Sequence, residues 1–168
     1  EMYPQIKSGA VISAVDLIFG LGRLGGLRPI EVEGATGLYN TNYEGKARAA
    51  IEALRNMDYV YLHMEAPDEA GHEGDVQLKI RTIEDIDTKV VGPILEEIAQ
   101  WSEPVCIALL PDHPTPCAIK THTRSDVPFI LYKPGIKADD VEKYDEDSCQ
   151  HGSLGRLELM QFMHKMME

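Results

Sequence analysis

The sequence predicts an α/β fold with a mostly parallel sheet and helices on both of its faces. Short apolar runs alternate with amphipathic stretches of helical period along the chain. Two of the apolar runs lead directly into turns that contain Pro, Asp and His, at the position where sheets of this class carry their chemistry. The 168 residues show no internal repeat and no long linker, so we expect one domain over residues 1–168.

The first part of the predicted fold consists of two strand–helix pairs. We expect a strand over residues 10–12 and then a helix that Ser13 caps and that runs to about Leu24. A second strand over residues 29–32 precedes a capping box at residues 41–44, which begins the second helix.

A third apolar strand over residues 59–62 precedes a loop that carries Asp68 and His72. The helix after this loop is the longest predicted element, from Asp75 to about Gln100. Pro93 lies inside it and is expected to kink it, because the proline ring clashes with the carbonyl four residues back.

The remainder of the chain is predicted to add two strands and a final helix. The strand over residues 105–110 runs into Asp112-His113, and His122 follows in a loop rich in Pro and Thr. The last strand covers residues 127–132, and the final helix follows Ser153.

Two aspartates and three histidines are therefore expected at the ends of neighbouring strands. Carboxylate and imidazole together suit Mn²⁺ or Zn²⁺ without a thiolate ligand. Taken alone, each of these side chains could equally be a helix-terminal acid or a solvated histidine, and it is their joint occurrence that favours a metal site. Glu65 and Glu69 flank the first pair and are expected to surround it, whereas His63 is expected to be a hydrogen-bonded histidine of the strand.

The charge balance limits the partners of the protein. The chain has 16 Lys and Arg against 28 Asp and Glu, a formal net charge of −12, and no basic stripe. Nucleic acid and anionic membranes are therefore not expected partners. The three cysteines match no disulfide or zinc-ribbon spacing, and no apolar run is long enough to span a bilayer, so we expect a reduced, cytoplasmic setting.

The motifs together resemble those of the cofactor-independent phosphoglycerate mutases, in the archaeal-type branch of that family, which belongs to the alkaline phosphatase superfamily. The resemblance covers nearly the whole chain. The stretches that carry it are residues 10–21, 34–46, 67–75, 111–116, 121–123 and 127–129.

The resemblance implies a core that holds two divalent ions, with Mn²⁺ expected and Zn²⁺ or Mg²⁺ found in relatives. Carried over by motif, Asp68, His72 and His122 hold one ion, and Asp112 and His113 hold the other. In the family, an Asp and a nucleophilic Ser from an N-terminal half complete the second site. We find no counterpart of these two residues or of the inserted substrate domain, so we expect the C-terminal part of an alkaline phosphatase-like core.

The implied activity is the glycolytic interconversion of 3-phosphoglycerate and 2-phosphoglycerate through a phosphoserine intermediate. Without the nucleophilic Ser, we expect residues 1–168 alone to be inactive. An exposed sheet edge would also favour some self-association of such a truncated chain.

Two other functions remain open from the sequence. One is a phosphotransferase that acts on homoserine, which would share the same metal ligands and differ in the missing parts. The other is a metal-binding or structural module without catalysis, which metal stoichiometry would distinguish.

Overall fold

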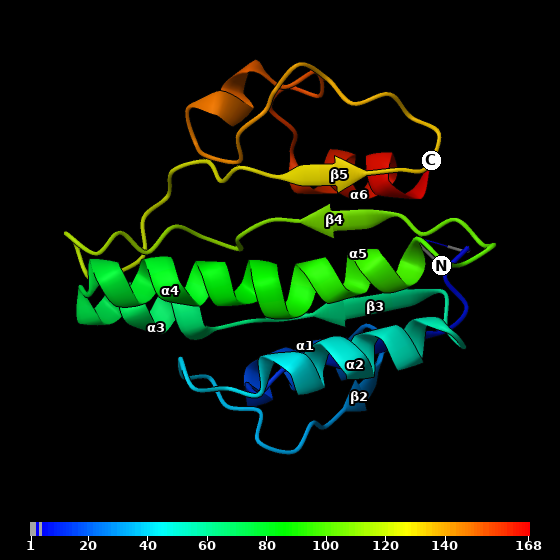
Figure 1. Cartoon of the computed structure of the whole chain (residues 1–168), viewed down its shortest axis with the longest axis horizontal. Coiled ribbons are helices and arrows are strands. Elements are labelled where there is room, and N and C mark those ends of the chain that lie inside the picture. The colour runs from blue at the N-terminus through cyan, green and yellow to red at the C-terminus, as the bar shows by residue number, and fades with distance from the viewer. Residues whose placement is uncertain (1–2, 4) are drawn as a thin grey trace. The chain divides into compact units, whose positions relative to one another are not determined.

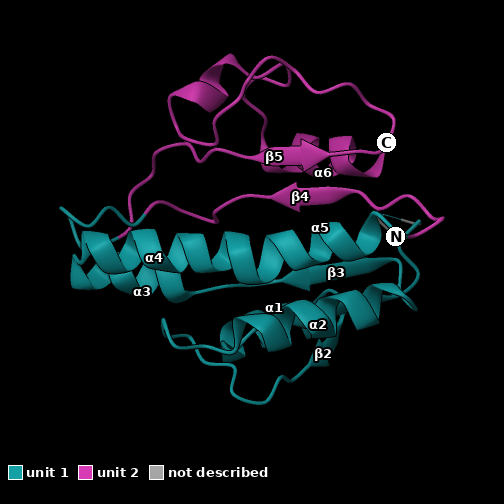
Figure 2. Cartoon of the chain, in the orientation of Figure 1, with its two compact units in different colours: residues 1–100, 115–121 teal, residues 101–114, 122–168 magenta. Residues whose placement is uncertain are grey.

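The computed structural model describes residue 3 and residues 5–168, and the chain divides into two compact units (Figure 2). The first unit comprises residues 1–100 and 115–121. The second unit comprises residues 101–114 and 122–168.

A three-stranded parallel sheet forms the centre of the first unit (Figure 1). Its strands β1 (Gly9–Ile12), β2 (Arg28–Ile30) and β3 (Tyr59–Leu62) lie in the order β2-β1-β3. The central strand β1 is paired on both edges and contacts both α1 (Asp16–Leu24) and α2 (Tyr43–Leu54), and all four of its residues are buried. The α/β class and the parallel pairing predicted from the sequence are confirmed.

Two helices connect these strands, α1 (Asp16–Leu24) and α2 (Tyr43–Leu54). The connection through α1 leads from β1 to β2 on one side, and the connection through α2 leads back past β1 to β3 on the other side. Because both crossovers are right-handed, α1 and α2 lie on opposite faces of the sheet. On the α1 side, a Cβ at Gly22 would lie only 2.4 Å from Cγ1 of Val11. The helix backbone thus lies directly on the central strand.

The helix starts differ in detail from the prediction. Ser13 does not cap α1, since Val15 occupies the N-cap position without a side-chain hydrogen bond. The Ser13 hydroxyl instead accepts from Val15 N at 3.1 Å in a local turn. In the second predicted capping box, Asn42 is the N-cap of α2, and its Oδ1 accepts from Gly45 N at 2.8 Å.

After β3, the chain forms a short helix where the sequence predicted a loop. This helix is α3 (Ala66–Glu73), which begins with Pro67 in its first turn and ends at Gly74 in the left-handed region. Proline is well suited to the first turn because the N–H that it lacks would have no helical partner there, and glycine suits the left-handed end. Asp68 and His72 are therefore helix residues.

The predicted long helix follows from Val76 to Ile98, as α4 (Val76–Ile86), the π-helical turn η1 (Asp87–Val91) and α5 (Gly92–Ile98). Figure 1 shows these elements as one continuous rod. The irregularity expected at Pro93 takes the form of η1, just before it, because widening the helix removes the need for the hydrogen bond that Pro93 cannot donate.

The core of the first unit lies where α2, α3 and the long rod meet. Its members are Tyr43, Ala47, Ala66 and Val90, with Leu62, Met64, Ile86 and Ile94 packed against them. Burial of these side chains fixes the start of α3, which carries the candidate site, against α2.

The second unit has a smaller, antiparallel pair of strands, β4 (Ile107–Leu109) and β5 (Ile130–Tyr132). Both strands are shorter than predicted. The 3₁₀ turn η2 (Ser148–His151) and α6 (Leu159–Met167) follow, so the last helix begins later than expected. The rings of Phe129 and Phe162 pack edge to face with their centroids 5.2 Å apart. This contact connects α6 with the segment before β5.

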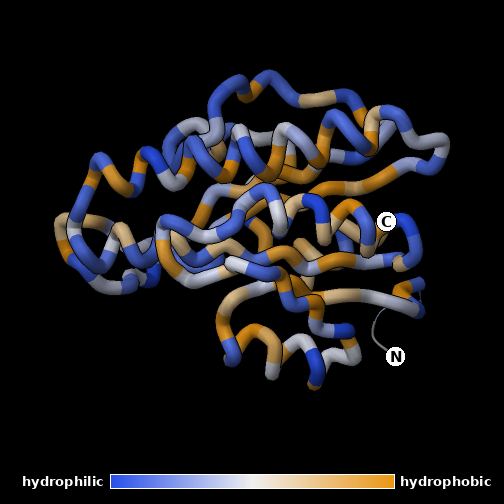
Figure 3. The backbone as a smooth tube through the Cα atoms, turned by 60° about the horizontal axis from the view of Figure 1, so that its bottom comes forward, coloured by the Kyte–Doolittle hydropathy of each residue, from blue (hydrophilic) through white to orange (hydrophobic). Residues whose placement is uncertain are grey.

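Hydrophobic and hydrophilic residues alternate along the helices (Figure 3), as expected for helices with one buried side. No helix within the described part of the chain combines the length and the apolar character needed to cross a membrane.

Candidate metal centre

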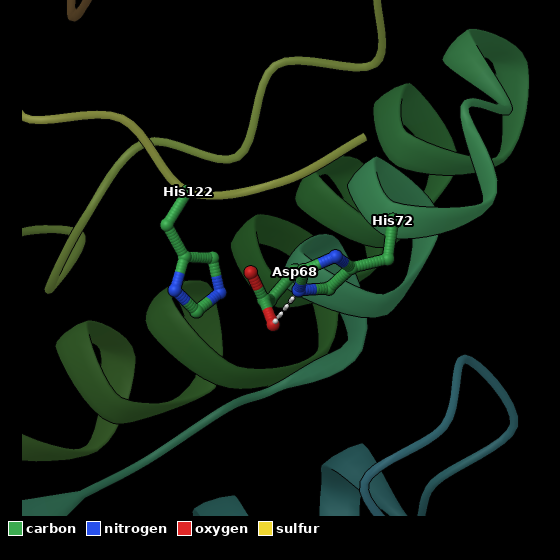
Figure 4. Close-up of side chains that lie close together, drawn as sticks. All are labelled: Asp68, His72 and His122. Carbon is green, nitrogen blue, oxygen red and sulfur yellow. Dashed lines mark ion pairs between the residues drawn. The ribbon is translucent and has the colours of Figure 1, made fainter. Parts of the chain in front are cut away.

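Asp68 and His72 lie one turn apart on the same face of α3, and their side chains point toward each other (Figure 4). Asp68 Oδ2 lies 3.3 Å from His72 Nε2. Both side chains are partly exposed, with 24% of Asp68 and 36% of His72 accessible to solvent. A carboxylate oxygen and an imidazole nitrogen are therefore presented together within reach of solvent.

The other polar atom of each side chain is held by the segment of residues 115–121. Asp68 Oδ1 accepts a short hydrogen bond from the Thr115 hydroxyl. His72 Nδ1 lies 3.1 Å from the carbonyl oxygen of Lys120. Because a carbonyl can only accept, Nδ1 must carry a proton, and in the neutral ring Nε2 is then the nitrogen that can bind a metal.

Gly71 in α3 and Gly74 just after it allow this segment to approach the helix. A Cβ at Gly71 would lie 2.4 Å from the Thr115 carbonyl oxygen. Gly74 has φ +75°, and a Cβ there would lie 2.4 Å from Cε of Lys120. The side chain of Lys79 then fixes the segment, since its Nζ donates to the Thr115 carbonyl at 2.6 Å.

Further carboxylates lie beside Asp68. One oxygen from each of Glu65, Asp68 and Glu69 lies within 4.8 Å of the others. The two glutamates therefore surround the aspartate, as the sequence suggested, and their negative charge favours a cation at this end of α3.

Asp112, His113 and His122 all belong to the second unit. Asp112 Oδ1 accepts from His113 N at 3.0 Å, and Asp112 Oδ2 lies 3.4 Å from His113 Nε2. The rings of His113 and His122 are adjacent, with centroids 3.8 Å apart. These three predicted ligands thus lie close together, and His122 directly follows the last residue of the 115–121 segment in the chain.

A polar cluster that the sequence analysis largely missed lies at the carboxyl ends of β1 and β3. Ser13 Oγ lies 3.1 Å from His63 Nδ1, which agrees with the prediction of a hydrogen-bonded His63. Lys46 is fully buried and donates from Nζ to the His63 carbonyl at 3.3 Å. Burial lowers the pKa of Lys46, and the negative charge of Glu65 partly opposes this shift.

The burial of Lys46 could have been inferred from its spacing, because it lies on the inner face of α2 beside Tyr43, Ala47 and Ala50. The roles of Thr115 and Lys79 had no such signal, since both depend on contacts with distant parts of the chain.

Comparison with known proteins agrees with this chemistry, because the profile of the metalloenzyme superfamily matches residues 6–168. The chain belongs to the metalloenzyme superfamily. Membership of this superfamily implies divalent metal binding. The profile match and the relatives described next together confirm the resemblance predicted from the motifs.

The relatives of this chain include proteins named 2,3-bisphosphoglycerate-independent phosphoglycerate mutase. The one from Methanosarcina mazei is 56% identical over 150 residues, which are 89% of this chain and 38% of the relative. The one from Thermoplasma volcanium is 39% identical and is matched over 96% of this chain and 38% of its own length. The chain thus spans about 38% of the length of these curated relatives.

One solved structure has a closely similar fold. The PH0037 protein from Pyrococcus horikoshii matches with a TM-score of 0.89 and 37% identity, over 95% of this chain and 48% of that chain.

The donor atoms of the candidate centre fit divalent metals. Asp68 and His72 present one oxygen and one nitrogen, and Asp112 and His113 present the same pair of donors. Neutral imidazole with carboxylate is a donor set that Mn²⁺ and Zn²⁺ accept.

Proposed function

We propose that this chain forms the metal-binding part of a phosphoglycerate mutase, which interconverts 3-phosphoglycerate and 2-phosphoglycerate. The observation that carries the proposal is the pairing of Asp68 Oδ2 and His72 Nε2 at 3.3 Å, with the second polar atom of each side chain already hydrogen-bonded. The names of the relatives support the choice of reaction.

In this proposal Asp68, His72 and His122 hold one divalent ion, and Asp112 and His113 contribute to a second. Mn²⁺ is the expected ion at both positions. When bound, such ions would neutralise phosphate charge and lower the pKa of a coordinated hydroxyl.

The protein's own groups would orient and tune the ligands. His72 Nδ1 keeps its proton because it donates to the Lys120 carbonyl, and Nε2 therefore remains available to the metal. Glu65 and Glu69 would add negative charge around Asp68 and so strengthen the attraction for a cation. A glycolytic role in the cytoplasm, acting on a phosphorylated small molecule, completes the proposal.

The direct test is Mn²⁺ binding to the chain by isothermal titration calorimetry, with Asp68→Asn and Asp112→Asn as variants. Each change removes one ligand charge, so we expect each to reduce affinity at one site by more than the about 10- to 100-fold loss typical of outer-shell groups. Binding should also raise Tm, because an ion at 100 times its Kd stabilises the folded state by about 2.7 kcal/mol.

Asp140→Asn is the matched control, since Asp140 is an exposed aspartate of the second unit and the change removes the same charge. It should leave affinity within a few-fold of the unmodified chain. Equal affinities for all three variants would contradict the assignment of the ligands.

A further inference from the structure

The segment of residues 115–121, here called the anchoring segment, belongs to the first unit although the residues on both sides of it belong to the second. It contacts the ligand-bearing face of α3 at both of its ends. Thr115 meets Asp68 at one end, and Lys120 meets His72 at the other.

We propose that Thr115 is a positioning residue that selects Oδ2 of Asp68 as the oxygen facing the metal. The inference rests on the metal centre proposed above, and it concerns a side chain outside the ligand set. A carboxylate offers two equivalent oxygens and can rotate between them. The hydrogen bond from the Thr115 hydroxyl holds Oδ1, so that Oδ2 remains on the side of His72 Nε2.

Burial makes this hydrogen bond difficult for water to replace. Only 3% of Thr115 is exposed to solvent. If the hydroxyl were removed, Asp68 Oδ1 would lose this hydrogen bond, and the carboxylate would be freer to turn away from His72. The loss would therefore appear in the geometry of the ligand pair.

The backbone of Thr115 is itself held in place. Its carbonyl accepts from Lys79 Nζ at 2.6 Å and lies where a Cβ on Gly71 would clash. Because its backbone is fixed, Thr115 holds its hydroxyl at a defined position beside Asp68.

The far end of the anchoring segment is a tight turn, in which Ile119 N and Lys120 N both donate to the Pro116 carbonyl. Lys120 has φ +59°, a left-handed conformation that is uncommon for a residue with a side chain. This turn directs the Lys120 carbonyl to His72 Nδ1. The same short segment therefore fixes the rotamer of one ligand and the tautomer of the other.

The test compares Mn²⁺ affinity in Thr115→Val, Thr115→Ser and Thr121→Val, each also measured for Tm without metal. Valine keeps the shape of threonine and removes the hydroxyl, so we expect a loss of about 10- to 100-fold in affinity. Serine restores the hydroxyl and should bind within a few-fold of the unmodified chain. Thr121 lies in the same segment and is exposed, so Thr121→Val should leave affinity unchanged.

A purely structural role for Thr115 would lower the metal-free Tm of Thr115→Val and leave its Mn²⁺ affinity intact, which would overturn the proposal. If that variant binds normally while Asp68→Asn does not, the positioning role fails and the metal centre stands. If the unmodified chain binds no Mn²⁺, both fail together.

A second measurement needs no variant. The hydroxyl proton of Thr115 should be protected from solvent exchange in NMR spectra of the unmodified chain, both without metal and with diamagnetic Mg²⁺ bound. Loss of protection when Mg²⁺ binds would show that the metal displaces Thr115 from Asp68, and would overturn the proposal.

Discussion

Tyr43 and Lys46 lie almost one turn apart on α2, and each buries a polar group in the core of the first unit. The Tyr43 hydroxyl donates to the Tyr39 carbonyl at 3.2 Å. Burial, and secondarily the charge of Asp85, raise the pKa of Tyr43 to about 12. The phenol is therefore strongly preferred over the phenolate in the folded protein.

This shift predicts a pH-dependent contribution to stability. Because the folded pKa lies above the unfolded value of about 10, the contribution is complete below pH 10 and is lost as the pH rises toward 12. We expect the free energy of unfolding to fall by about 1–2 kcal/mol more in the unmodified chain than in Tyr43→Phe over this window. Urea unfolding followed by circular dichroism at pH 9, 10 and 11 measures the free energy of unfolding of the unmodified chain and of Tyr43→Phe, with pH 9 as the baseline. Parallel pH profiles of the two proteins would contradict the prediction.

At the level of single residues, the sequence predicted the ligand types and missed the groups that orient them. The spacing of Asp68 and His72 is sufficient to bring them together on one helix face. Their partners at Thr115 and Lys120 are 47 and 48 residues away, and one of them is a backbone carbonyl that every residue possesses. Ser13 was misread as a helix cap because its approach to His63 is also a long-range contact.

Helix α1 shows how two glycines of one element can have different roles. A Cβ at Gly22 would meet the Val11 side chain at 2.4 Å, whereas a Cβ at Gly20 would have no atom of the described residues within 4 Å, apart from its chain neighbours and the backbone of its own helix. Gly22 therefore permits close packing of the helix on β1, while Gly20 contributes only flexibility.

We expect Gly20→Ala and Gly22→Ala to have opposite effects on stability. Alanine at position 20 should stabilise the protein by about 0.5–1 kcal/mol through its better helix propensity. Alanine at position 22 should destabilise it by about 1–3 kcal/mol, because the added methyl must displace Val11 or the helix. Urea denaturation of the two variants compares them directly, each serving as the other's control, and a change of the same sign in both would refute this interpretation.

At the level of elements, β1 and β3 were predicted closely because each is a compact apolar run beside polar turns. Helix α3 was missed because Pro67 and Gly71 are usually helix breakers. The structure gives each a reason for its place: proline begins the helix, and glycine makes room for the Thr115 carbonyl. The π-helical turn η1 could not be located from the sequence, which indicated only an irregularity at Pro93.

For the whole molecule, the net charge of −12 is the dominant electrostatic property. Excess like charge destabilises a compact state through self-repulsion, and salt screens it over about 10 Å at 0.1 M. We expect Tm to rise by a few degrees when NaCl increases from 10 to 150 mM in the absence of divalent metal. Tetramethylammonium chloride is the control, since a similar rise excludes specific binding of Na⁺ to carboxylates, and a constant or falling Tm would contradict the prediction.

The class of the whole fold followed from alternating strand and helix signals, but its division into two units did not. No change of composition marks residues 115–121, and their place in the first unit depends on Gly71, Gly74 and Lys79. The packing of residues 115–121 in the first unit depends on contacts between residues far apart in the sequence. The hydrophobic periodicity of the sequence carries no information about such contacts.

The return of the anchoring segment to α3 also has a consequence for the order of folding. The backbone hydrogen bonds of α3 join residues close in sequence, whereas the contact from Thr115 to Asp68 closes a loop of 47 residues, at an entropic cost of about 3 kcal/mol. During synthesis the ligands on α3 therefore leave the ribosome well before the residues that orient them. The helix can form early, but a rigid Asp68–His72 pair exists only after Lys120 has been added to the chain.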